Sequence, residues 1–333
     1  MSISKTARLL LGTLVPLFFT VQAKAQEQLN IYAVMPEKFS SQLVDAFSQK
    51  SGVKVNFVRM ASGETLTRLI AEKKNPQVDI ILGGPADIYE AGIKEDLFVP
   101  YERSDWGIPE EYRSAKGYWT GIGLNPLIFM TNTNFLKKNN LNAPDSWQDL
   151  LNPAYKNGLQ MADARTSGTA TERIFALVKL YDEDGAFDYQ KKLNANVQLY
   201  TKSGQGGAIP VAGGQAASGI FYLVDALDIQ QQGYPVTITY PKEGTTYGIE
   251  CVGIVKGAKN PEAAKKFMDW ATSVELANVM GEKKINFVPV HKDAKITDPV
   301  LDISKVTFLH ADTAWKGEKR KEYVERWIKD VIQ

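Results

Sequence analysis

Apolar and polar positions along the first third of the chain predict strands and helices in turn. Strands are predicted at residues 29–34, 54–58 and 78–82, where apolar side chains run together or alternate with polar ones. Helices are predicted at 39–47 and 66–70, where apolar side chains recur every three or four residues. This β-α-β-α-β order predicts a parallel sheet with right-handed crossovers.

The remainder of the chain repeats the alternation. Apolar runs typical of strands occupy residues 121–130, 159–162, 219–224, 236–240 and 249–255. Helical patterns follow at about 145–150, 169–180, 187–193, 261–280 and, just after Gly317, 318–332. Two α/β units joined by strands in mid-chain predict a two-lobed α/β fold. Ligands of open α/β sheets bind beyond the carboxyl ends of the strands, so two such edges that face each other predict a cleft.

The N-terminus has the pattern of a secretory signal peptide. Lys5 and Arg8 precede an apolar run over 9–21, and Ala23 and Ala25 form a small-x-small cleavage site. A membrane anchor is the weaker interpretation, because the run falls short of the ~20 residues that a spanning helix needs. We expect residues 1–25 to be removed and the mature chain to be exported and free of membrane-inserted segments.

Composition and charge narrow the function classes. The chain has 333 residues, of which 44% are hydrophobic and 23% charged, as in ordinary globular proteins. Cleavage after residue 25 would remove three basic residues and no acidic one, which leaves a slightly acidic protein and argues against nucleic-acid binding. Two histidines exclude a His-rich metal site, and Cys251 has no partner for an intrachain disulfide. We expect neither a cofactor nor a metal.

One segment between a predicted strand and a predicted helix has the residues of an anion site. Its residues are Thr166, Ser167, Gly168 and Thr169. A helix N-terminus presents free N–H groups and positive partial charge, and the hydroxyls add donors. The alternative is a plain helix cap, a position that favours Ser and Thr in any case.

Two further turns are candidates for the cleft. Thr201, Ser203 and Gly204 lie in a second hydroxyl- and glycine-rich turn, which could equally be a flexible surface loop. Gly84 and Pro85 end the third predicted strand, where close backbone approach and an ordinary tight turn are equal interpretations. Lys38 follows the end of the first strand and is also placed at the presumed cleft.

Aromatic and acidic side chains near strand ends complete the candidate set. Trp119, Tyr222 and Tyr247 could stack on a ring or a sugar, although core packing is the usual fate of aromatic residues. Asp225 and Glu250 could accept hydrogen bonds from ligand hydroxyls, and the alternative for them is a surface or hinge position.

Several segments of the chain resemble the periplasmic binding proteins of the ferric-iron, sugar-phosphate and phosphonate group of ABC importers. The matching segments are 78–87, 166–169, 200–204, 233–236, 240–244 and 256–264. The resemblance implies a type II fold in which each lobe is a mixed sheet flanked by helices. Lobe one would comprise 26–120 with about 250–300, and lobe two 121–249 with about 301–333.

The resemblance also implies a function in the periplasm. The chain would be a monomeric receptor that catalyses nothing and delivers a small anionic solute to an inner-membrane ABC permease. A hydroxyl-rich cradle beside aromatic side chains suits a hexose phosphate, a vitamin B6 phosphate or an aminoalkylphosphonate. We expect the phosphate or phosphonate to be held mainly by lobe two.

Iron and catalysis are the alternatives. Ferric binders of this group resemble one another in a consecutive tyrosine pair, and the matching place here reads Phe221-Tyr222, which lacks one phenolate. We therefore do not expect iron. Neither a Gly-x-Ser-x-Gly nor a His-Glu-x-x-His motif is present in the sequence, so a carboxylate-based hydrolase is the remaining enzyme interpretation.

Overall fold

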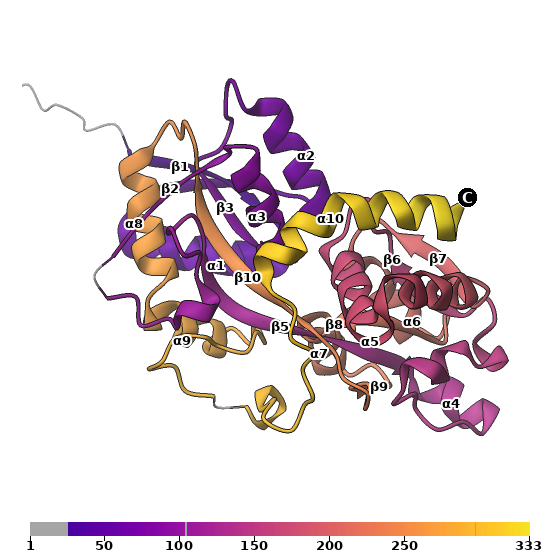
Figure 1. Cartoon of the computed structure of the whole chain (residues 1–333). Coiled ribbons are helices and arrows are strands. Elements are labelled where there is room, and N and C mark those ends of the chain that lie inside the picture. The colour runs from indigo at the N-terminus through magenta and orange to yellow at the C-terminus, as the bar shows by residue number, and fades with distance from the viewer. Residues whose placement is uncertain (1–25, 104, 297) are drawn as a thin grey trace, which may run out of the picture.

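The computed structural model describes residues 26–103, 105–296 and 298–333. The signal peptide predicted over 1–25 lies outside the described residues. Figure 1 shows two groups of strands and helices joined by two long strands and by the C-terminal helix. None of the described helices is both long and apolar enough to cross a membrane.

Lobe one is built on three parallel strands, as the sequence predicts. The strands are β1 (Gln28–Ala33), β2 (Lys54–Arg59) and β3 (Ile80–Pro85), and the helices between and after them are α1 (Glu37–Ser51), α2 (Ser62–Glu72) and α3 (Ala86–Lys94). Helix α1 forms because Phe39, Leu43 and Phe47 share one face and are buried against the sheet. It ends at Gly52, whose φ of 71° suits the left-handed turn that closes a helix.

Lobe two repeats this plan. Its parallel strands are β6 (Leu159–Ala162), β7 (Val197–Thr201) and β8 (Ser218–Tyr222), with β9 (Val236–Thr239) nearby, and its helices are α4 (Thr133–Asn139), α5 (Gly168–Asn194), α6 (Ala208–Ala212) and α7 (Leu223–Gln231). Helix α5 is the longest, with a break at Asp182, where φ is 61°. That break separates the two helices predicted for this region.

Two long antiparallel strands join the lobes. They are β5 (Thr120–Asn132) and β10 (Tyr247–Val255). Strand β5 pairs with β10 in its first half and with β8 and β9 in its second half, so it belongs to both sheets. The sheet order among the described strands is β2-β1-β3-β10-β5-β8-β6-β7, with β4 (Phe98–Val99) beside β10. After β10 the chain returns to lobe one through α8 (Pro261–Ala271) and α9 (Val274–Glu282).

The C-terminal helix α10 (Thr313–Trp327) continues as a helical turn over Ile328–Ile332 and packs on both α3 and α5. The contact with α3 is close at Gly317, where an added Cβ would come within 2.4 Å of the Glu90 Cβ. Helix α10 therefore spans the two lobes rather than belonging to one sheet (Figure 1).

Three predicted elements differ from the structure. The last helix begins at Thr313, not after Gly317, because the Asp312 side chain caps it by accepting from the Trp315 N–H. The helix predicted over 261–280 is two helices. The first ends at Ala271, and the next residue, Thr272, caps it with a hydroxyl that donates back to the Met268 carbonyl. The apolar run 219–224 is a strand only to Tyr222, where α7 begins.

Candidate functional site

A cleft lies where the two lobes meet. It is lined by the carboxyl ends of the lobe-one strands, by the start of α5 and by the two crossing strands. Most of the predicted site residues line it: Gly84, Pro85, Ser167, Gly168, Thr169, Ser203, Gly204, Tyr222, Asp225 and Glu250. The tertiary structure thus brings together segments that the sequence placed at separate strand ends.

Hydroxyls and backbone donors gather at the start of α5. Ser167 is the residue before this 27-residue helix, and its side chain makes no capping hydrogen bond. The plain-cap interpretation therefore does not describe Ser167, which is 2% exposed and lines the cleft. The second turn packs directly on the helix start, since a Cβ at Gly204 would come within 2.0 Å of the Thr169 Oγ1.

Arg59, at the end of β2, is a site residue that the sequence reasoning missed. Its guanidinium lines the cleft, and its Nε is buried without a hydrogen-bond partner among the described residues. Burial lowers the pKa of Arg59, and the nearby carboxylates of Asp225 and Glu64 oppose that shift. A basic residue one position past the predicted strand 54–58 was the available signal, because the ends of parallel strands meet at one edge.

Ser62, Asn125 and Gln205 also line the cleft and were not predicted. The Ser62 hydroxyl is buried without a partner among the described residues. Asn125 accepts from the Val224 N–H at 3.2 Å and donates to the Glu250 carboxylate at 3.4 Å, so it holds that carboxylate against the start of α7.

Two buried carboxyl groups supply acceptors in the same cleft. Glu250 accepts from the Gly84 N–H at 2.6 Å, whereas Asp225 accepts no hydrogen bond from the described residues. Burial raises the pKa of Asp225 to about 7, with a further rise from Glu250 and an opposing effect of Arg59. Burial likewise raises the pKa of Glu250 to about 7, against the Gly84 and Asn125 hydrogen bonds. Both groups can exchange a proton near neutral pH.

Tyr222 contributes an aromatic wall to the cleft. Its hydroxyl is buried without a hydrogen-bond partner among the described residues, and burial raises the pKa of the phenol well above its ordinary value. Its neighbour Phe221 belongs to the other core cluster. Across residues 26–103, 105–296 and 298–333, no three His, Cys, Asp or Glu side chains form a group that could hold a metal ion.

Two predicted residues support the turns rather than line the cleft. The Thr166 hydroxyl donates to the Lys202 carbonyl at 2.6 Å, which ties the two donor-rich turns together. The Thr201 hydroxyl donates to the carbonyl of Ser203 at 2.8 Å and closes the second turn.

The three other predicted residues lie elsewhere. Lys38 forms an ion pair of 2.6 Å with Asp228. The Trp119 ring is buried and donates to the Glu90 carboxylate at 2.7 Å. Tyr247 lines a second groove, beside α10.

The lobes touch each other beside the cleft. The Gly63 N–H donates to the Thr166 carbonyl at 2.8 Å, and Lys202 pairs with Glu64 at 3.0 Å. The Lys38–Asp228 ion pair also joins lobe one to lobe two. The structure is therefore a closed arrangement of the lobes.

Comparison with known proteins identifies the family. A family model of bacterial extracellular solute-binding proteins matches residues 75–316. The structure of the periplasmic binding protein AfuA from Actinobacillus pleuropneumoniae, with exogenous fructose-6-phosphate bound, has a TM-score of 0.88 and 31% identity, and the match covers 92% of this chain and 99% of that one. The structure of the periplasmic binding protein P5PA has a TM-score of 0.86 and 28% identity, and the match covers 92% of this chain and 100% of that one. An uncharacterized protein of Haemophilus influenzae is 33% identical over 93% of this chain and 92% of its own length.

The chain belongs to the bacterial extracellular solute-binding proteins. Its fold is the two-lobed α/β fold of the type II periplasmic binding proteins, which confirms the resemblance found in the sequence. Proteins of this family bind small solutes for ABC importers, and AfuA and P5PA are periplasmic binding proteins.

Proposed function

We propose that this chain is a periplasmic receptor for a small organic phosphate or phosphonate, which it delivers to an inner-membrane ABC permease. Ser167 carries the proposal: it stands at the start of a long helix, its side chain makes no cap, and it lines a cleft that Arg59 also lines. A phosphate offers several acceptors to such a set of donors. We further propose that the chain is exported through a cleaved signal peptide and acts as a monomer.

Magnitudes explain why the cleft needs several donors. Micromolar binding requires about −8 kcal/mol, and one helix N-terminus supplies at most ~2 kcal/mol. A hydrogen bond to a charged group contributes ~1.5–3 kcal/mol. Ser167, Thr169, Ser203 and Arg59 together reach the required range, and the contribution of Arg59 extends the cradle beyond lobe two.

Asp225 and Glu250 favour a ligand with donors at its other end. Two carboxyl groups can accept from the hydroxyls of a sugar phosphate, or from the ammonium group of an aminoalkylphosphonate. The bound fructose-6-phosphate of AfuA, 31% identical to this chain, supports a phosphorylated ligand. Tyr222 adds a flat apolar surface that suits a sugar or an aromatic ring.

Iron has less support. Among the described residues, Tyr222 is the one phenol that lines the cleft, where a consecutive tyrosine pair would supply two. A carboxylate-based hydrolase has no observation in its favour beyond the raised pKa values of Asp225 and Glu250, and burial of the two carboxyl groups accounts for both.

Mass spectrometry of the small molecules that co-purify with the native protein tests the proposal directly. We expect a phosphorus-containing compound, returned unchanged after release. Calorimetry should show that fructose 6-phosphate or another organic phosphate binds and that its dephosphorylated counterpart does not. Equal affinity for the two compounds would contradict the proposal that the cleft binds an anion. Conversion of the ligand to a product would show that the chain is an enzyme.

A further inference from the structure

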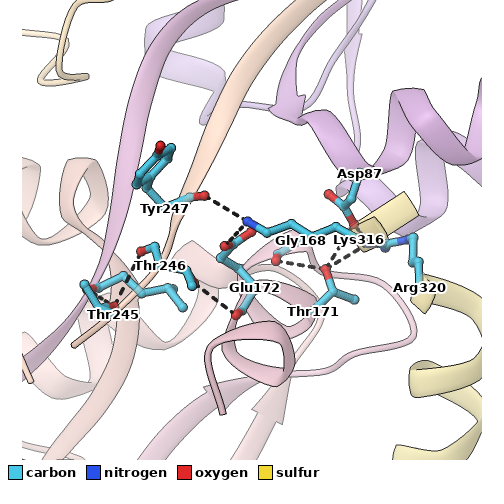
Figure 2. Close-up of polar contacts among 10 residues, drawn as sticks. Asp87, Gly168, Thr171, Glu172, Thr245, Thr246, Tyr247, Lys316 and Arg320 are labelled. Carbon is cyan, nitrogen blue, oxygen red and sulfur yellow. Dashed lines mark hydrogen bonds and ion pairs between the residues drawn. The ribbon is translucent and has the colours of Figure 1, made fainter. Parts of the chain in front are cut away.

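Helix α10 carries two buried cations that pair with residues of both lobes. Figure 2 shows Lys316 donating to the Glu172 carboxylate at 2.5 Å and to the Tyr247 carbonyl at 3.2 Å. On the same helix, Arg320 pairs with Asp87 and donates to the Thr171 hydroxyl at 2.8 Å. We call Asp87, Thr171, Glu172, Lys316 and Arg320 the ion-pair cluster.

The partners of α10 lie directly behind the residues that line the cleft. Asp87 stands two positions after Pro85 in the first turn of α3. Thr171 and Glu172 stand three and four positions after Gly168 in the first turns of α5, and the Thr171 hydroxyl donates to the Gly168 carbonyl at 3.0 Å. The two helix starts that meet at the cleft are therefore the two that α10 holds.

Arg320 also joins the lobes at one point. Its guanidinium reaches Asp87 in lobe one and Thr171 in lobe two, and the Thr171 hydroxyl lies 3.5 Å from the Asp87 carboxylate. At the cleft the same two helices touch, since a Cβ at Gly168 would come within 2.7 Å of the Pro85 Cγ. Any opening of the cleft that separates α3 from α5 must stretch the contacts of Arg320.

Because the charged groups of the cluster are buried, each must stay close to its counter-charge. The charged side chains of Asp87, Glu172, Lys316 and Arg320 are each at most 7% exposed. A buried charge that loses its counter-charge is strongly unfavourable, because water does not replace the partner. The cluster thus favours the one arrangement of α3 and α5 in which all of its contacts form, and in this structure that arrangement is the closed one.

We propose that Arg320 and Lys316 are positioning residues for ligand binding, which hold the starts of α3 and α5 in the closed arrangement from outside the cleft. The inference rests on the proposed function only in taking this cleft as the ligand site. It predicts that loosening the cluster lowers the closed population and speeds ligand release, although neither residue lines the cleft.

Arg326 offers a matched control on the same helix. It pairs with Asp184 of α5 at 2.6 Å and with Asp330 in the next turn at 3.1 Å, so its contacts involve lobe two and the C-terminal segment alone. Replacement of Arg326 removes an ion pair of α10 without touching a contact between the lobes.

The test measures lobe separation directly. Spin labels at Val58→Cys in lobe one and Leu199→Cys in lobe two, both exposed positions, report the distance between lobes in the ligand-free protein and with saturating fructose 6-phosphate. We expect Arg320→Gln to reduce the closed fraction. The affinity for fructose 6-phosphate should fall about tenfold, which corresponds to ~1.4 kcal/mol, because the ligand dissociates faster. Arg326→Gln should match the parent protein, and Arg320→Lys should restore part of the closed fraction.

Unchanged distance distributions in Arg320→Gln, whether or not the melting temperature falls, would show that the cluster has only a structural role and would overturn the proposal. So would a parent protein with no closed population in either condition. If Arg320→Gln does not fold, Thr171→Val removes one contact between the lobes without leaving a charge unpaired, and it must also lower the closed fraction. A parent protein that closes but binds no organic phosphate would contradict the proposed function and leave this inference standing.

Discussion

The cleft and the ion-pair cluster contain the same kinds of side chains in opposite states. In the cleft, the Arg59 Nε, the Ser62 hydroxyl and the Tyr222 hydroxyl are buried without partners among the described residues, and Asp225 accepts no hydrogen bond. In the cluster, Lys316 and Arg320 each face a buried carboxylate. Buried polar groups are normally paired. Unpaired ones also occur elsewhere among the described residues, including the Asp87 Oδ1 of the cluster itself. What distinguishes the cleft is that three such groups, on Arg59, Ser62 and Tyr222, line one cavity, whereas both cations of the cluster are paired.

The largest expected effect tests the structural side of this comparison. Lys316→Met leaves Glu172 buried without its counter-charge, and breaking a buried pair costs about 3–5 kcal/mol. We expect that loss in the free energy of unfolding, measured with denaturant. Lys319→Met is the control, because the pairs of Lys319 with Glu183 and Glu322 are more exposed and contribute little to stability. Equal losses in the two variants would contradict the assignment.

Arg59→Gln tests the binding side. The arginine has no ion pair to lose among the described residues, so the free energy of unfolding should not fall. Binding of an organic phosphate should weaken by about tenfold to a hundredfold, because a hydrogen bond to a charged group contributes ~1.5–3 kcal/mol. Calorimetry and thermal melting measure the two quantities. A variant that loses stability but binds as before would place Arg59 among the structural residues.

Ser167→Ala and Ser203→Ala sharpen the comparison at single hydroxyls. Each substitution should weaken the binding of an organic phosphate by about tenfold and leave the melting temperature unchanged. Ser146→Ala is the control, since Ser146 is a true cap that accepts from the Gln148 N–H at 3.1 Å. It should lower stability by about 1 kcal/mol and leave binding unchanged. Unaltered binding in both cleft variants would show that Ser167 and Ser203 are turn residues only.

The effect of Asp225→Asn on stability depends on pH. The folded pKa of Asp225, about 7, lies above the ordinary value of 3.8. Its contribution to stability is therefore complete below about pH 4 and is lost as the pH rises through 7. The variant should be more stable than the parent protein above pH 7, by up to about 4 kcal/mol, because each of the roughly three pKa units corresponds to ~1.4 kcal/mol, and it should not differ at pH 3.5. Denaturant melts across this range measure the difference, and a variant that is less stable at pH 8 would contradict the burial argument.

Local patterns in the sequence predicted most of the fold. The strands and helices of lobe one, the donor-rich start of α5 and the turn at Ser203 and Gly204 all follow from spacing within a few residues. The boundaries that differ, at Thr313 and Thr272, depend on single side-chain hydrogen bonds to the backbone, which spacing does not reveal.

The site was predicted where local signals sufficed and missed where they did not. A helix start or a glycine turn has characteristic residues that can be recognised in the sequence, which is why Ser167 and Gly204 were predicted. The direction of a side chain at the end of a strand depends on the segments packed against it, so Arg59 was missed while Trp119, predicted for the cleft, lies buried beside Glu90. Whether Trp119 and the other predicted residues outside the cleft affect binding stays a prediction.

The sequence by itself determined the order of the elements, the family and the chemistry available at each strand end. Only the tertiary structure decided which polar groups are paired. Arg320 meets Asp87 across 233 positions of the chain, and Glu250 meets Gly84 across 166. Pairing and burial are properties of contacts between distant segments, and neither exists until the lobes have folded and closed on each other.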